Sequence, residues 1–255
     1  MERSYLVFMQ EMTWREYVDR IRQGAVVILP CGALEQHGPH LPLETDELIA
    51  RRIAEEVAGH VGAIVAPSIV YGAKSQALTG GGQVFPGTTS LDGQTLIFLV
   101  RDIVRELLRH GARKIVLLNG HGENTAFLYE GVDLALSEKG PAEVKVLVVN
   151  WWDLVSERTL DRVFPEGFPG WDLEHAAVIE TSLVYALAPE LVWREVITDE
   201  ELEFIPRYTI FPQPQNLVPE SGLLSKVSPA SREKGVMLFK EVQQALLDVL
   251  DCEFS

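Results

Sequence analysis

Cysteine, basic residues and long apolar runs are all scarce in this chain of 255 residues. Its two cysteines, Cys31 and Cys252, imply no disulfide framework and favour a reducing compartment, the cytoplasm. Lysine and arginine number 22 against 37 aspartates and glutamates, and the formal net charge of −15 would repel nucleic acid and anionic membranes. No apolar run approaches the roughly 18 residues of a membrane span, and the N-terminus lacks a secretory signal. We therefore expect no nucleic-acid or membrane partner, and a small neutral or cationic substrate or metal ions suit this charge.

The chain does contain an alternation of apolar strands and amphipathic helices. Apolar runs at 25–29, 63–66, 114–118 and 144–149 alternate with helical periodicity at 13–23, 46–60, 91–110 and 125–139. This order predicts a parallel sheet covered by helices on both faces, with ligands bound beyond the carboxyl ends of its strands. Because no repeat or linker interrupts it, residues 1–255 are predicted to form a single α/β domain.

The pattern weakens toward the C-terminus. Residues 162–171 are predicted to form a loop, and 174–187 a helix. Prolines accumulate from 189 to 229, which predicts an irregular arm in which 203–204 and 208–211 are candidates for short strands. Ser228 and Pro229 supply a hydroxyl cap and a first-turn proline for a last helix.

Two pairs of glutamate and histidine follow predicted strands at the same spacing. Glu35 and His37 come after the first strand, and His121 and Glu123 come after the third. In extended backbone, residues two apart point to one face, so each pair can reach one small volume. With Asp46 nearby, these nitrogen and oxygen ligands suffice for two divalent ions if one carboxylate bridges them, and they favour zinc or manganese over copper.

A two-metal site of this kind predicts hydrolysis of an amide-like or ester-like bond, because the ions lower the pKa of a bridging water and polarise the carbonyl that it attacks. His175, at a predicted helix start, can protonate a leaving nitrogen, although a capping or surface histidine would have the same spacing. Trp152 and Trp171 can wall off a flat substrate, and core tryptophans would look the same.

Three competing motifs fail on detail. Gly120-His121-Gly122 lacks the third glycine of a dinucleotide fingerprint, and Glu123 would repel a pyrophosphate. Gly80-Gly81-Gly82 is not followed by the lysine of a phosphate-binding loop. No Gly-x-Ser-x-Gly nucleophile elbow is present, so a serine hydrolase of that type is not indicated.

Several motifs resemble the creatininase (creatinine amidohydrolase) family. The resemblance is carried by Glu35-Gln36-His37-Gly38-Pro39-His40 with Asp46, by Asn119-Gly120-His121-x-Glu123-Asn124, and by Glu180-Thr181-Ser182. Further motifs narrow it toward the members that act on creatinine: Tyr71-Gly72-x-Lys74-Ser75-Gln76, Phe85-Pro86-Gly87-Thr88-Thr89, Gly170-Trp171-Asp172 and Ser231-Arg232-Glu233-Lys234-Gly235. The match runs from about Leu29 to the last helix.

The resemblance implies a three-layer α/β/α domain with a mostly parallel sheet, two divalent ions (zinc and manganese, or two zinc) and a homohexamer. Glu35 and His121 would hold the first ion, His37 and Glu123 the second, and Asp46 would bridge them. His175 and Glu123 would be catalytic, with His175 giving a proton to the ring nitrogen as the cyclic amide of creatinine opens to creatine. The residues implied to contact substrate are Ser75, Gly122, Trp152, Trp171, Asp172 and His175.

One position departs from the family pattern. Members that act on creatinine carry a tyrosine between the two ligands of the second pair, whereas Gly122 stands here. If that position contributes only its backbone amide, little changes, but if the tyrosine ring packs on the substrate, the pocket is larger here. Two alternatives therefore stay open: hydrolysis of another cyclic amide or of a formamide pyrimidine precursor, and a non-catalytic metal-binding protein.

Overall fold

A computed structural model of the chain describes residues 6–76, 79, 81–137, 143–200, 202, 208–212 and 217–255. Among these residues, parallel strands form one sheet in the order β2-β1-β3-β4. The strands are β1 (Val27–Cys31), β2 (Ile64–Val65), β3 (Lys114–Asn119) and β4 (Lys145–Asn150). The last residues of the three longer strands, Cys31, Asn119 and Asn150, are in register with one another, so these strands end at the same edge of the sheet.

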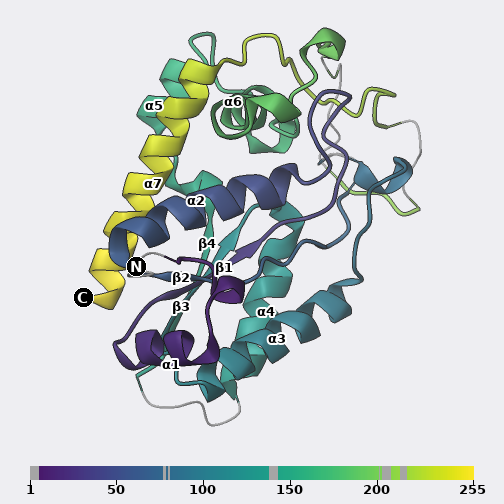
Figure 1. Cartoon of the computed structure of the whole chain (residues 1–255). Helices are drawn as coiled ribbons and strands as arrows, with labels where there is room; N and C mark the ends of the chain where they lie inside the picture. The colour runs from purple at the N-terminus through teal and green to yellow at the C-terminus, as the bar shows by residue number, and fades with distance from the viewer. Residues whose placement is uncertain are drawn as a thin grey trace.

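Helices cover both faces of this sheet (Figure 1). One layer holds α1 (Trp14–Arg22), α3 (Gly93–Arg109) and α4 (Thr125–Ser137), and the other holds α2 (Thr45–Val61), α6 (Val178–Leu187) and α7 (Arg232–Phe254). Side chains along β1 alternate between the two layers. Val27 and Leu29 pack against the layer of α1, α3 and α4, and Ile28 packs against the layer of α2, α6 and α7. The predicted α/β architecture with a parallel sheet is confirmed.

Local sequence signals set the ends of two helices. The Thr13 hydroxyl accepts a hydrogen bond from the Glu16 amide, and the Glu16 carboxylate accepts one from the Thr13 amide, so the capping box that begins α1 is present. The helix α2 ends at Gly62, whose φ of 65° lies in the left-handed region that favours glycine.

The C-terminal third differs from the prediction in its details. A short helix, α5 (Glu157–Val163), forms before the predicted loop, capped by Ser156. The helix α7 begins at Arg232 and is capped by Ser231, because Ser228 instead bonds the carboxylate of Asp199 through its amide and hydroxyl. Residues 208–211 form no strand, and the candidate strand at 203–204 lies outside the described residues, as does the predicted helix end near 139.

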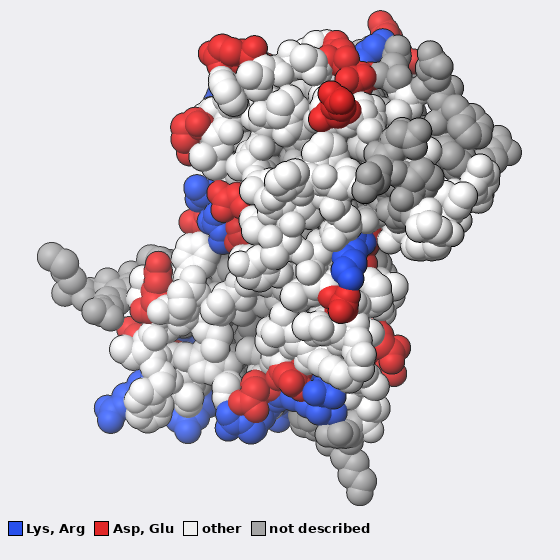
Figure 2. Space-filling view, turned by 90° about the vertical axis from the view of Figure 1, so that its right-hand side faces the viewer, with Lys and Arg blue, Asp and Glu red and all other residues white. Residues whose placement is uncertain are grey.

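The described helices include none that is long and apolar enough to cross a bilayer. On the face drawn in Figure 2, charged side chains of both signs lie along the margins and at a few places farther in, and white residues separate them. The excess of acidic residues in the sequence is therefore not gathered into one acidic surface over the described part of this face.

Candidate active site

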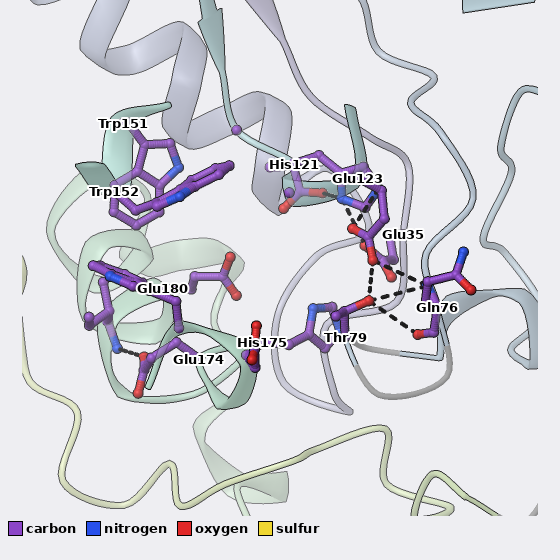
Figure 3. A pocket seen from close by; sticks show the side chains of 16 residues that line it. Glu35, Gln76, Thr79, His121, Glu123, Trp151, Trp152, Glu174, His175 and Glu180 are labelled. Atoms are coloured by element: carbon purple, nitrogen blue, oxygen red, sulfur yellow. Dashed lines mark hydrogen bonds and ion pairs between the residues drawn. The ribbon is translucent and has the colours of Figure 1, made fainter. Parts of the chain in front are cut away.

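A cavity of about 410 Å³ opens beyond the carboxyl ends of β1, β3 and β4, at the edge where a parallel sheet binds ligands (Figure 3). Its size suits a small molecule. Segments that are distant in sequence meet around it: the residues after β1 and the start of α2, the segments after β3 and β4, the turn before α6, and the two residues Gln76 and Thr79. The side chains that line the cavity include Glu35, Asp46, His121, Glu123, Trp151, Trp152, Trp171, Asp172, Glu174, His175 and Glu180.

The first cluster of ligand atoms surrounds His121. Its Nδ1 lies 3.2 Å from Oε2 of Glu35 and 3.1 Å from Oδ2 of Asp46. Its Nε2 lies 3.0 Å from the carbonyl oxygen of Ala73, an acceptor that fixes the ring proton on Nε2. The lone pair of Nδ1 is thereby left for a cation shared with the two carboxylates.

The second cluster surrounds His37, which is held in the same manner through its other nitrogen. Its Nδ1 lies 3.1 Å from the carbonyl oxygen of Glu35 and donates to it. Its Nε2 faces two carboxylates, with Oδ1 of Asp46 at 3.0 Å and Oε2 of Glu180 at 3.6 Å. Asp46 therefore presents one oxygen to each cluster, as a bridging ligand does.

The histidines and carboxylates of both clusters are in close contact. Oε1 of Glu35, Nε2 of His37 and Oδ2 of Asp46 are buried, and within the described part of the chain none of them has a conventional hydrogen-bond partner. Ligands about 2.0–2.2 Å from a zinc ion lie roughly 3 Å apart, which is the separation seen in both clusters. Three sets of three residues have donor atoms spaced to hold an ion: Glu35 with Asp46 and His121, His37 with Asp46 and Glu180, and Glu35 with His37 and His175. The residues present fit two divalent cations.

The charges of the two clusters support the same assignment. Burial lowers the pKa of His37, but Asp46 and Glu180 outweigh it and raise that pKa well above its usual value. Burial likewise opposes charge on His121, whose pKa is nonetheless raised well above its usual value by Glu35 and Asp46. The carboxylates therefore stabilise positive charge at both imidazoles, whether a proton or a metal ion carries it.

Glu123 lies differently from the other four residues expected as ligands. Its Oε1 accepts hydrogen bonds from the hydroxyl of Thr79 and, at 3.1 Å, from the amide of Gln76. Its Oε2 lies 3.5 Å from Nε2 of His121, the ring nitrogen turned away from Asp46. The structure brings Glu35, His37, Asp46 and His121 together, and it places Glu123 on the cavity wall behind His121.

The opposite wall is aromatic. Trp152, Trp171 and Asp172 line the cavity, in agreement with their expected place at a substrate pocket. Trp151 packs edge-to-face against Trp152 and Trp171, with ring centroids 5.9 and 6.1 Å apart. Nothing in the sequence distinguishes Trp151 from Trp152, since both follow β4, and in the structure both rings line the cavity.

His175 stands between the two walls. Its ring centroid lies 4.4 Å from that of His37, and its Nε2 lies 2.9 Å from the side-chain nitrogen Nε2 of Gln36. The preceding Glu174 accepts a hydrogen bond from the amide of Ile179 at 2.7 Å, which caps α6 and delays its start to Val178. Burial raises the pKa of the Glu174 carboxyl to about 8.

The remaining residues expected to contact substrate, Gly122 and Ser75, differ in their position relative to the cavity. Gly122 lies on the wall, and a β-carbon built there meets no atom within 4 Å. Ser75 is buried behind the wall, where its hydroxyl accepts a hydrogen bond from the amide of Gly82 at 2.9 Å. Sequence reasoning missed Glu180 as a site residue, although it belongs to one of the motifs that carried the family resemblance.

The chain is similar to known proteins over nearly its whole length. The family model described as creatinine amidohydrolase matches residues 10–250. Creatinine amidohydrolase of Pseudomonas putida is 47% identical over 98% of both chains. The 3-dehydro-scyllo-inosose hydrolase of Thermotoga maritima is 30% identical, over 98% of this chain and 83% of its own.

Solved structures of creatininase have the same fold as this chain. A crystal structure of creatininase superposes with a TM-score of 0.96 at 47% identity, over 98% of this chain and 99% of that one. Other creatininase structures, 46% identical, are described as a manganese form, as a Zn–Zn type of a glutamate-to-glutamine variant, and as that variant complexed with creatine. With its fold, its paired ligand clusters and its full-length similarity in agreement, the chain belongs to the creatininase (creatinine amidohydrolase) family.

Proposed function

We propose that this protein is a binuclear metal-dependent amidohydrolase that opens the cyclic amide of creatinine to give creatine. The observation that carries the proposal is the pair of ligand clusters joined by Asp46, which open into a cavity with an aromatic wall. The 47% identity to a creatinine amidohydrolase over nearly the whole chain supports creatinine as the substrate. The reaction adds water across the ring C–N bond, so that hydroxyl goes to the carbonyl carbon and a proton to the ring nitrogen.

The cofactors that we propose are two divalent ions, zinc and manganese or two zinc. Glu35 and His121 hold the first ion, His37 holds the second, and Asp46 contacts both. Glu123 was expected at the second ion, but the 3.6 Å approach of Glu180 to His37 favours Glu180 there. We propose Glu123 as a catalytic carboxylate beside the first ion. When bound, the ions supply a water-derived nucleophile at neutral pH and polarise the substrate carbonyl.

The chain itself orients the substrate and supports the departing nitrogen. Trp152 and Trp171 can enclose a flat ring, and the carboxylate of Asp172 can accept hydrogen bonds from its N–H groups. His175 is the proposed donor toward the ring nitrogen. Ser75 and Gly122 complete the pocket, Gly122 from the wall and Ser75 through its bond to Gly82.

Metal removal and restoration tests this function. Chelation is expected to abolish creatine formation from creatinine, and added zinc or manganese is expected to restore it, with about two ions bound per chain. Full activity of metal-free protein would contradict the proposal. Two bound ions with no turnover of any tested amide would favour a non-catalytic metal-binding protein.

A second substrate class is favoured by one observation. The open space at Gly122 leaves room on the cavity wall for a bulkier molecule than creatinine. Assaying creatinine beside larger cyclic amides and formamides at matched concentrations decides between the two classes. A specificity constant at least about tenfold higher for another amide would replace creatinine as the substrate.

The assembly and location that we propose are a single-domain protomer, a homohexamer and the cytoplasm. Large exposed apolar side chains support an oligomer, since Trp193, Tyr208 and Phe211 are 62%, 64% and 74% exposed. Both cysteines are free, which suits a reducing compartment. Light scattering of the purified protein tests the hexamer, and a monomeric mass would contradict it.

A further inference from the structure

Gln36 lies between the ligands Glu35 and His37 in the sequence, and its side chain is buried. Its Oε1 accepts a hydrogen bond from the amide of Gly38 at 2.8 Å. Its Nε2 lies 3.0 Å from the carbonyl oxygen of Gly222 and 2.9 Å from Nε2 of His175. One amide thus joins three segments: the loop after β1, the turn before α6 and the segment before α7.

The two backbone partners decide which way this amide points. A backbone N–H can only donate, so the atom facing Gly38 is the oxygen of Gln36. A carbonyl can only accept, so the atom facing Gly222 is the NH2 group. The same NH2 group faces His175, and it can only donate there.

This orientation fixes the proton of the imidazole. Because Nε2 of His175 accepts from Gln36, the single ring proton of the neutral side chain sits on Nδ1. The tautomer is therefore imposed from behind the cavity, since Gln36 is not among the residues that line it. Nδ1–H is the ring group left to meet a bound molecule.

Gln36 is also held against rotation. Gly222 has a φ of 73° and approaches so closely that a β-carbon there would overlap Oε1 of Gln36. The backbone amide of Gln36 donates to the hydroxyl of Thr88 at 2.9 Å, which anchors the loop on its other side. An amide constrained at its oxygen, its nitrogen and its backbone cannot exchange its ends without breaking these bonds.

We propose that Gln36 is a positioning residue that holds His175 as its Nδ1–H tautomer, so that His175 meets the substrate as a hydrogen-bond donor through Nδ1. This inference rests on the proposed function, in which His175 serves the ring nitrogen. Gln36 would thus position a side chain that serves the substrate, whereas its sequence neighbours Glu35 and His37 hold metal ions.

The direct test is the tautomer of His175 in the zinc-loaded protein, read from two-bond ¹H–¹⁵N correlation spectra, with His175→Gln used to assign its signals. The native protein is expected to show the Nδ1–H pattern. In Gln36→Glu the carboxylate can only accept, so the pattern is expected to change to Nε2–H. An Nε2–H pattern in the native protein would overturn the proposal. This readout needs no turnover, so it stays informative even if creatinine is not the substrate.

The second test separates positioning from support of the fold. Gln36→Met keeps the side-chain length but loses the amide, and it is expected to lower kcat about 10- to 100-fold with little change in KM or bound metal. In a His175→Ala background the same substitution is expected to have almost no further effect, because its action passes through His175. An equal loss in both backgrounds would overturn the proposal.

The matched control is Gln244→Met on α7. The Gln244 side chain is exposed and donates a hydrogen bond to Asp248 one turn away, so the substitution removes the same amide far from the site. It is expected to leave kcat, KM and the His175 spectrum unchanged. A loss of activity there as large as in Gln36→Met would show that the effect is not specific to the contact with His175, which would also overturn the proposal.

Discussion

The two glutamate and histidine pairs have the same spacing in the sequence but different geometry in the fold. Glu35 and His37 are both buried, and each contributes to a ligand cluster. His121 is buried as well, but Glu123 turns from the cluster toward Gln76 and Thr79. The second pair is thus divided between the metal clusters and the cavity wall.

The local backbone explains the difference. Residues two apart share a face only where the chain is extended. His121 has extended dihedrals, but Gly122–Asn124 is a 3-10 turn that leads into α4, so Glu123 follows His121 around a turn. The carboxylate that approaches His37 besides Asp46 is that of Glu180, from a helix that begins far along the chain. Spacing predicts convergence only when the conformation between the residues is also known.

Asp46→Asn tests what both clusters share, and it should have the largest effect. Each imidazole lies about 3 Å from one Asp46 oxygen, so an amide there presents one neutral oxygen and one NH2 group that repels a cation. We expect loss of both ions and a fall in kcat/KM of at least about 10³-fold. Metal analysis after dialysis is the measurement, with exposed Asp102→Asn as control. Two retained ions would show that Asp46 does not bridge.

Glu180→Gln and Glu123→Gln probe the difference between the clusters. Since Glu180 faces His37 at 3.6 Å, its amide variant should bind one of the two ions about 10- to 100-fold more weakly, and the other normally. Glu123→Gln should lower kcat with a smaller loss of metal, because Gln76 and Thr79 hold that carboxylate on the wall. Competition with a chelator measures both affinities. A larger loss of metal affinity in Glu123→Gln than in Glu180→Gln would indicate that Glu123 is the ligand of the second ion.

The sequence predicted the fold well because the determining signals are local. Apolar runs and helical periodicity located the strands and main helices, and a parallel sheet follows from their alternation. The predictions were wrong where contacts between residues distant in sequence determine the local structure. Ser228 has the sequence of a helix cap, but the carboxylate of Asp199, distant in sequence, takes its hydroxyl and amide.

The candidate site divides in the same way. Glu35, His37 and His121 directly follow strands whose ends meet, so strand order alone brings them together. Glu180 and Gln36 could not be placed from sequence, since their roles depend on how the turn before α6 packs over the loop after β1. The family resemblance included both residues in its motifs without giving either a part in the site.

Glu174→Gln examines the helix that supplies Glu180 to the second cluster. Burial raises the Glu174 pKa from 4.5 to about 8, so its protonated form is favoured in the folded state. That contribution to stability is complete below about pH 4.5 and is lost as pH rises toward 8. The glutamine variant cannot ionise but can still cap α6. Its stability relative to the native protein should therefore rise between pH 6 and 8, by on the order of 1–3 kcal/mol.

Urea denaturation of zinc-loaded protein at several pH values measures this difference, with exposed Glu190→Gln as control. A constant difference across the range would mean that Glu174 is ionised in the folded protein. Turnover should change less than the pH dependence of stability, since the Glu174 carboxylate bonds the backbone of α6.

Gly122→Ala should have the smallest effect, and its neighbour Gly120 provides a matched contrast. A β-carbon at Gly122 meets nothing within 4 Å, so alanine should leave metal content unchanged and kcat/KM for creatinine within about threefold. A β-carbon at Gly120 would overlap the carbonyl oxygen of Asp46, so Gly120→Ala should displace that ligand and weaken metal binding. Steady-state kinetics and metal analysis of both variants test this contrast. Equal losses of metal and activity in the two variants would mean that Gly122 is packed as closely as Gly120. The larger pocket inferred at Gly122 would then be wrong.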